Sequence, residues 1–259
     1  MTTSYDCSDP DQRSEGIAAA QRALAARQCV VIPTDTVYGI AADAFSPQAV
    51  ATLLASKGRG RNMPPPVLIP RVQTMDGLAI DVHPDARRLA AAFWPGALTI
   101  ICHAQPSLTW DLGETLGTVA LRMPDDRVAL DLLAMTGPLA VSSANRTGQP
   151  AASTAADAMA QLAESAAVYL DGGTRSAGSS VGSTIVDATS EVLRVVRQGS
   201  IPLDRLRRTV PNLLGMDEAP AEDPPEDGSS EGESPAGGST AVTVSDPEAP
   251  VRLQPRERP

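Results

Sequence analysis

Short apolar runs alternate with amphipathic segments along most of this chain, and this alternation constrains its fold more than any other feature. The segment 11–27 carries apolar residues at helical spacing and leads into the run CVVIPT, which is typical of a buried strand. The pattern returns with variation as far as the run EVLRVV. Strands separated by helices of about 10 to 15 residues indicate an α/β sheet that helices cover. The last strands follow one another without helices, so we expect a mixed sheet.

Capping residues mark the ends of two expected helices. Ser46 precedes a proline, as an N-cap does before the first helical position, and an apolar stripe then runs to Lys57 and stops at Gly58. Further along the chain, Thr154 and Asp157 have the spacing of a capping box, which predicts the start of another helix.

A polar carboxyl-terminal segment sets the limit of the expected domain. The chain has 259 residues and a formal net charge of −10; positions 216–259 hold eleven acidic residues and three arginines, a net of −8, which leaves −2 for the remainder. This segment lacks aromatic residues and is rich in Pro, Gly, Ser and Glu, so it cannot bury enough apolar surface to offset its ordering entropy. We predict one domain at 12–212 and a disordered tail at 215–259, which either aids solubility or binds a partner.

The cysteines and histidines are too few and too scattered for a zinc cluster. The chain contains Cys7, Cys29 and Cys102, together with His83 and His103. We expect both histidines to be structural and no metal site in the protein. The amino terminus is polar, and no run approaches the roughly 18 apolar residues of a membrane span. The sequence therefore predicts a soluble cytoplasmic protein that does not enter a membrane.

Four polar or glycine-rich stretches follow strands or end helices, where α/β proteins place their ligand sites. They are PTDTVYG (33–39), SKGRGR (56–61), SSANRTG (142–148) and DGGTRSAGSSVGST (171–184). The last stretch is either a flexible linker or a mobile loop over the site. No Walker-type motif G-x-x-x-x-G-K-[ST] occurs, which excludes that kind of phosphate cradle.

Lys57 is the only lysine of the chain, and its position on the apolar stripe directs its stem toward the covered side of the helix. A cation that points inward requires an anion, whereas the alternative is ordinary helix-end chemistry with Gly58 as the cap. Arg59 and Arg61 favour the anion, because three cations within five residues repel one another. Either a phosphate ligand or an RNA backbone would relieve this repulsion.

Two further features suggest an anion site at strand ends. The stretch SSANRTG supplies hydroxyl and amide donors directly after an apolar run, although its composition is also that of a turn. In TVALRMP, Arg122 lies at the end of a strand, where a guanidinium suits a carboxylate or a phosphate. An ordinary surface arginine is the alternative for this position.

The chain resembles the YrdC-like threonylcarbamoyl-adenylate synthase family in the order of seven stretches over about 12–206: PTDTVYG, SKGRGR, WPGALT, ALRMP, SSAN, STIVD and VVRQGS. The resemblance implies a twisted open sheet with helices on both faces and a concave cleft. It also implies a nucleotidyltransferase that converts L-threonine, bicarbonate and ATP into threonylcarbamoyl-AMP and pyrophosphate. A separate transferase complex would then carry the threonylcarbamoyl group to transfer RNA, which leaves room for a transient RNA contact.

The resemblance also assigns residues. The family's K-x-R pair falls on Lys57 and Arg59, to which it gives a catalytic role. It implies ATP binding by Lys57, Arg59, Ser143, Asn145 and Arg197, and threonine binding by Thr36, Tyr38, Arg122 and Ser183. Adenylation brings two anions together, so cations and fixed donors are its main requirement. Mg²⁺ would arrive with ATP and not in a protein cage.

The chain departs from the family pattern beside the K-x-R pair. Gly60 stands where the family usually has a proline, a run of three prolines at 64–66 lengthens the spacer, and no histidine follows Ile69. Two other functions stay open on the residues alone: a double-stranded RNA-binding module of the same fold, and a carbamoyl-adenylate enzyme for another amine. The nearly neutral charge of the domain disfavours the RNA module, because nonspecific RNA binding needs a basic face.

Overall fold

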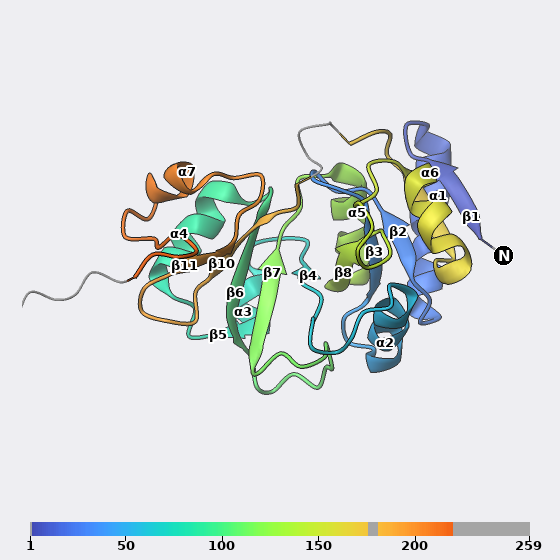
Figure 1. Ribbon diagram of the computed structural model, residues 1–259. Helices are drawn as coiled ribbons and strands as arrows, with labels where there is room; N and C mark the ends of the chain where they lie inside the picture. The colour runs from blue at the N-terminus through green and yellow to red at the C-terminus, as the bar shows by residue number, and fades with distance from the viewer. Residues whose placement is uncertain (1, 176–180, 220–259) are drawn as a thin grey trace, which may run out of the picture. The chain divides into compact units, whose positions relative to one another are not determined.

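An eleven-stranded mixed sheet forms the centre of the computed structural model, which describes residues 2–175 and 181–219 (Figure 1). The strands are β1 (Thr3–Asp6), β2 (Val30–Ile32), β3 (Gly39–Asp43), β4 (Val67–Leu68), β5 (Ala79–Ile80), β6 (Leu98–Ala104), β7 (Thr118–Arg122), β8 (Leu139–Ser143), β9 (Val168–Asp171), β10 (Thr184–Asp187) and β11 (Arg194–Arg197). Their order is β1-β9-β2-β3-β8-β4-β7-β6-β10-β11, and β5 pairs with β6. Parallel and antiparallel neighbours both occur, which confirms the predicted mixed sheet.

Helices cover both faces of the sheet, as expected. They are α1 (Pro10–Ala25), α2 (Pro47–Ser56), α3 (Thr74–Leu78), α4 (Pro84–Phe93), α5 (Arg127–Thr136), α6 (Ala155–Leu162) and α7 (Leu203–Arg207), with a 3-10 turn at Ala163–Ser165. Side chains alternate between the two faces of a strand. On β2, Val30 and Ile32 pack in one cluster with α1 and α5, whereas Val31 packs in the other with α2 and α6.

The expected helix ends are confirmed. The Ser46 hydroxyl accepts a hydrogen bond from the Ala49 amide at 3.3 Å, and Gly58 has a φ of +64°, as a left-handed helix cap requires. The Thr154 hydroxyl likewise accepts from the Asp157 amide at 3.0 Å. These caps fix where the chain leaves α2 and enters α6, and the segment that follows α2 contributes residues to the cleft described below.

The folded part extends past both predicted limits of the domain. β1 lies before position 12 and pairs with β9, because the polar residues of an edge strand still bond through their backbone. After position 212, Arg194 donates to the carbonyl oxygens of Gly215 at 3.1 Å and Glu218 at 2.6 Å. The remainder of the predicted tail lies outside the described residues, and so do 176–180 of the stretch DGGTRSAGSSVGST, so both interpretations stay predictions.

The longest helix, α1, has 16 residues. Within residues 2–175 and 181–219, no helix has the length and apolar character that crossing a membrane would need.

Candidate active site

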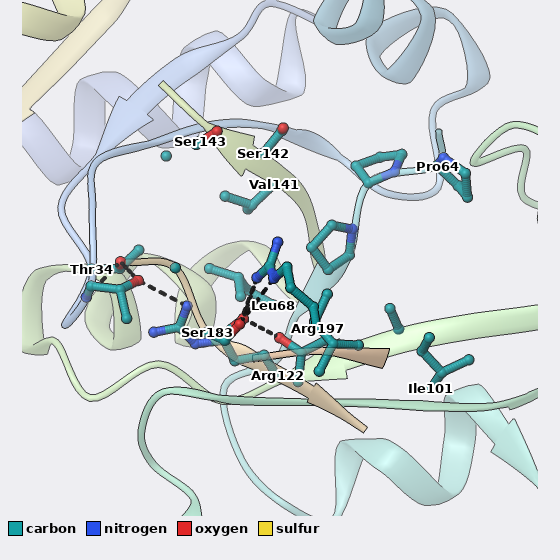
Figure 2. Close-up of a pocket in the computed structure, with 18 of the residues that line it drawn as sticks. Thr34, Pro64, Leu68, Ile101, Arg122, Val141, Ser142, Ser143, Ser183 and Arg197 are labelled. Atoms are coloured by element: carbon teal, nitrogen blue, oxygen red, sulfur yellow. Dashed lines mark hydrogen bonds between the residues drawn. The ribbon is translucent and has the colours of Figure 1, made fainter. Parts of the chain in front are cut away.

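A cleft of about 280 Å³ opens on the sheet between β7, β8, β10 and β11 and the loops that follow β2 and α2 (Figure 2). In Figure 2, Ser142 and Ser143 lie on one side of the cavity, and Arg122, Ser183 and Arg197 lie on the other. Seven of the nine predicted site residues line it: Thr36, Tyr38, Arg59, Arg122, Ser143, Ser183 and Arg197. The structure thus brings together segments that are more than a hundred residues apart in the sequence.

Arg122 is buried at the end of β7, with 8% of its side chain exposed, so the alternative of a surface arginine is wrong. Its Nη2 donates to the Asp35 carboxylate at 2.6 Å, and its Nη1 donates to the Thr36 hydroxyl at 3.0 Å. Nε donates to the carbonyl oxygen of Gly96 at 3.0 Å. Burial lowers the pKa of Arg122, and the carboxylate of Asp35 opposes that shift. This guanidinium is therefore fixed in direction at the edge of the cleft.

Arg59 and Arg197 add positive charge that no carboxylate of the described residues balances. Arg59 donates from Nη1 to the Ser142 hydroxyl at 3.0 Å, and its buried Nε has no hydrogen-bond partner in the part of the chain that the structure describes. Arg197 donates from Nη2 to the carbonyl oxygen of Ser183 at 2.7 Å. Within the described ranges neither arginine forms a salt bridge. Burial lowers the pKa of both groups, and at Arg197 the nearby arginines lower it further. The cleft is suited to a polyanion.

Hydroxyl groups also line the cleft. The Thr34 hydroxyl accepts from the amides of Thr36 and Val37 at 3.2 and 3.3 Å, and it donates to the Val37 carbonyl oxygen at 2.6 Å. On the other side, the hydroxyls of Thr99 and Ser183 lie 2.7 Å apart. The loop after β2 is therefore held in shape by its own side chain, as in other Ser/Thr turns.

Lys57 lies behind the cleft and does not line it. Its ammonium donates to the carbonyl oxygens of Ser143 and Asn145, and it lies 3.4 Å from Asn145 Oδ1. The residue is 4% exposed. Burial, and then the charge of Arg59, lower the pKa of Lys57 to about 8. Within the protein, carbonyl and amide oxygens receive this inward cation, and Gly58 caps the helix; the expected contact with a phosphate or an RNA backbone stays a prediction.

Asn145 is also directed away from the cleft. Its amide Nδ2 donates to the carbonyl oxygens of Arg146 at 2.9 Å and Gln149 at 2.7 Å, which holds the stretch SSANRTG as a turn. Together with Lys57, this side chain fixes the backbone that follows β8. The turn interpretation of the stretch is therefore confirmed, and Ser143 is the predicted phosphate ligand from this stretch that reaches the cleft.

Tyr38 is among the residues that line the cleft, but its hydroxyl bonds elsewhere. The hydroxyl donates to the Gly173 carbonyl oxygen at 2.7 Å, accepts from the Gly172 amide at 3.0 Å, and lies 3.1 Å from Asp171. Burial, and then the charge of Asp171, raise the pKa of Tyr38. This phenol therefore stays protonated and joins the loop after β2 to the loop after β9.

Several residues of the site were not predicted. Asp35 pairs with Arg122, and the Ser142 hydroxyl accepts a hydrogen bond from Arg59. Both residues lie within the polar stretches 33–39 and 142–148, and this position was the sequence feature that could have predicted them. The prolines at 64–66 form an apolar part of the lining. In the sequence they stand out only because they lengthen the spacer relative to the family pattern. The two histidines are structural, as expected: His83 caps α4, and His103 bonds to the Thr189 carbonyl.

The fold and the cleft define an α/β protein whose cavity is lined by buried arginines and hydroxyl groups. Residues 22–199 match the model of the Sua5/YciO/YrdC family, which is described as telomere recombination. A Mycobacterium tuberculosis protein with threonylcarbamoyl-AMP synthase as its provisional name is 50% identical over 219 residues, which cover 85% of this chain and 98% of that protein. The chain therefore belongs to the Sua5/YciO/YrdC family, as the sequence resemblance implied.

Two more distant relatives extend the comparison. The threonylcarbamoyl-AMP synthase of Bacillus subtilis is 32% identical over 212 residues, covering 81% of this chain and 59% of that protein. The crystal structure of Pyrococcus abyssi Sua5 complexed with L-threonine is 27% identical and has a TM-score of 0.74, with 83% of this chain and 62% of that chain covered. The chain thus spans about three fifths of these longer relatives.

Proposed function

We propose that this protein is an L-threonylcarbamoyladenylate synthase, which makes threonylcarbamoyl-AMP and pyrophosphate from L-threonine, bicarbonate and ATP. The observation that supports this most is the pair Arg59 and Arg197, which face one cleft without carboxylate partners among the described residues. A triphosphate would neutralise them. The names of the relatives point to the same activity, with full-length coverage in the mycobacterial protein.

The phosphate side of the cleft comprises Arg59, Arg197 and Ser143. In this proposal the two guanidiniums bind phosphate oxygens, and the orphan Nε of Arg59 gains an acceptor that it lacks in the free protein. Lys57 and Asn145 act from behind by fixing the backbone that carries Ser143. Their predicted direct contact with ATP becomes, in this geometry, a positioning role.

The amino-acid side of the cleft comprises Arg122, Thr36, Tyr38 and Ser183. Arg122 supplies a fixed positive charge for the carboxylate of threonine, and the hydroxyls of Thr36 and Ser183 supply hydrogen bonds. Asp35 holds Arg122 in place and offsets part of its charge. Residues of both sides line the same cleft, so the two substrates would meet within it.

The reaction needs no side-chain nucleophile. The threonine amine and bicarbonate form a carbamate with loss of water, and a carbamate oxygen then attacks the α-phosphorus while pyrophosphate leaves. The protein's contribution is to bring two anions together and to stabilise the charge that develops, which makes it a nucleotidyltransferase. We propose that Mg²⁺ enters with ATP as part of the substrate, because Mg²⁺ in such sites is bound chiefly through substrate phosphates.

The product suggests the partner. A mixed anhydride of a carbamate and AMP hydrolyses readily, so a transferase that consumes it soon after release is required. We propose that this partner is a tRNA threonylcarbamoyl transferase complex, with at most transient RNA contact by this chain.

Pyrophosphate release tests the proposed function. We expect release from the full chain with Mg-ATP only when threonine and bicarbonate are both present. Equal release with serine, or without an amino acid, would contradict the assignment of threonine. Salt-sensitive binding of double-stranded RNA without turnover would support the RNA-binding alternative instead.

Arg59→Met should lower this rate by about two orders of magnitude, since a preorganised contact to the developing charge is lost. Arg61→Met is the matched control, because Arg61 is half exposed and already paired with Asp111 at 2.8 Å. It should keep the wild-type rate within about twofold.

A further inference from the structure

Arg175 lies in the stretch DGGTRSAGSSVGST and has none of the roles above. Its guanidinium lies behind the wall of the cleft that 34–38 form, and it does not line the cleft itself. Nη1 donates to the carbonyl oxygen of Thr34 at 3.1 Å and to the Asp126 carboxylate at 2.8 Å. The two charged side chains are 15% and 12% exposed, so this ion pair is largely removed from solvent.

The same guanidinium contacts the loop after β9. Nη2 donates to the carbonyl oxygen of Gly172, and Cζ lies 5.6 Å from the centroid of the Tyr38 ring. A Cβ atom on Gly172 would lie 2.9 Å from Pro33 and 3.2 Å from Nη2 of Arg175, so the loop, the proline and the guanidinium are in close contact. Arg175 therefore joins the loop after β2, the loop after β9 and the start of α5.

Each anchor of this clamp is itself fixed. Asp126 caps α5, where its other carboxylate oxygen accepts from the amides of Val128 at 2.9 Å and Ala129 at 3.0 Å. On the cleft side, the Thr34 hydroxyl orients the backbone of Thr36, as described above. A displacement of Thr34, which is labelled in Figure 2, would thus be passed to the Thr36 hydroxyl and to its bond with Arg122.

We propose that Arg175 is a positioning residue that fixes the 34–38 wall and thereby sets the affinity of the cleft for its amino-acid substrate. The inference rests on the proposed function for the identity of that substrate. The phosphate side, with Arg59 and Ser143, is outside the contacts of Arg175, so ATP binding is independent of the clamp.

Steady-state kinetics of the full chain test this. Arg175→Met should raise the KM for threonine by about tenfold, while the KM for ATP stays within about twofold. The substitution removes the buried hydrogen bonds that hold the 34–38 wall, and in the proposed arrangement this wall contacts threonine and not ATP. Arg175→Lys keeps the charge and should recover part of the loss. Arg13→Met is the control, because Arg13 also pairs with an aspartate of α5, Asp131, but does not contact the 34–38 wall. In this variant the KM values for threonine and ATP should both be unchanged.

Equal rises in both KM values, or a change in kcat alone, would overturn the proposal. Should Arg175→Met fold poorly, the KM split in Arg175→Lys decides. Hydrogen exchange of the free protein separates this inference from the proposed function: Arg175→Met, unlike Arg13→Met, should speed exchange at 34–39 and leave β6 unchanged, because β6 pairs with β5, β7 and β10 and not with the 34–39 segment. If the wild type proves inactive with threonine, this exchange alone decides, and unchanged exchange at 34–39 rejects the clamp.

Discussion

The ammonium group of Lys57 lies among three oxygen atoms at the end of β8 and just after it: the carbonyl oxygens of Ser143 and Asn145 and the side-chain amide oxygen of Asn145. An ammonium offers three N–H donors on one small atom, which matches this set. A guanidinium is planar and larger, so arginine could not enter the same space without moving the turn. This explains a lysine at one position of a chain in which every other Lys or Arg is arginine.

Because Lys57 is the only lysine, ¹⁵N-lysine labelling gives a single side-chain signal. We expect this signal in the free protein to titrate with a pKa of about 8, below the ordinary value of 10.5, because burial disfavours the charge. The unfolded chain holds its proton up to pH 10.5, so this group makes the free energy of unfolding rise with pH between about 8 and 10.5. Lys57→Met assigns the signal, and a midpoint near 10.5 would contradict the burial of the charge.

At the scale of elements, the end of β11 depends on a close backbone approach. A Cβ atom on Gly199 would lie 2.3 Å from the carbonyl carbon of Ser183 and 2.3 Å from the amide nitrogen of Thr184. These are backbone atoms of the segment that receives Arg197, so they cannot turn aside as a side chain could. Only glycine permits β10 and β11 to meet in this way.

Gly199→Ala should therefore destabilise the protein by more than about 2 kcal/mol and lower activity through displacement of Ser183 and Arg197. Thermal unfolding and pyrophosphate release measure the two effects. Gly77→Ala is the matched control, since Gly77 lies in α3 with open space around its Cα, and alanine there should be neutral or slightly stabilising. Equal melting temperatures of the two variants would show that the approach is not tight.

Elements with strong local signals were predictable, and elements without them were not. Capping residues located α2 and α6 because a cap acts within four residues. β1 is polar and mostly exposed, and β3 has the sequence GIAAD, whose glycine and alanines favour no strand. Both strands form because the sheet supplies their partners: β9, which is distant in the sequence, for β1, and the neighbouring β2 together with the distant β8 for β3.

The same distinction applies to the cleft. Arg122 and Ser143 stand at strand ends, so their meeting was expected from the topology of α/β proteins. The direction of each side chain was not predictable. Lys57 and Asn145 turn away from the cavity, and Arg175 reaches Asp126 across 49 positions, since these choices depend on the acceptors that tertiary packing provides.

At the scale of the whole molecule, the carboxyl-terminal limit of the folded part can be measured. The sequence alone predicts that truncation after Leu214 changes nothing. The structure predicts instead a fall in melting temperature of about 3 to 6 °C, because Arg194 loses its acceptors on Gly215 and Glu218. Truncation after Ala219 keeps these contacts and should leave the melting temperature unchanged. Equal melting temperatures of the two truncated chains would support the domain limit at 212 that the sequence predicts.

The pairing of β1 with β9 places Thr3 opposite Val168, 165 positions later in the chain. During synthesis on the ribosome the first strand therefore emerges long before its partner, and Ser183 and Arg197 follow later still. Contacts between distant segments form slowly, and a strand edge is prone to aggregation until its partner strand is available. An unfinished chain thus carries an open edge and an incomplete cleft, and the proposed nucleotide site has all its residues only after Arg197 has emerged.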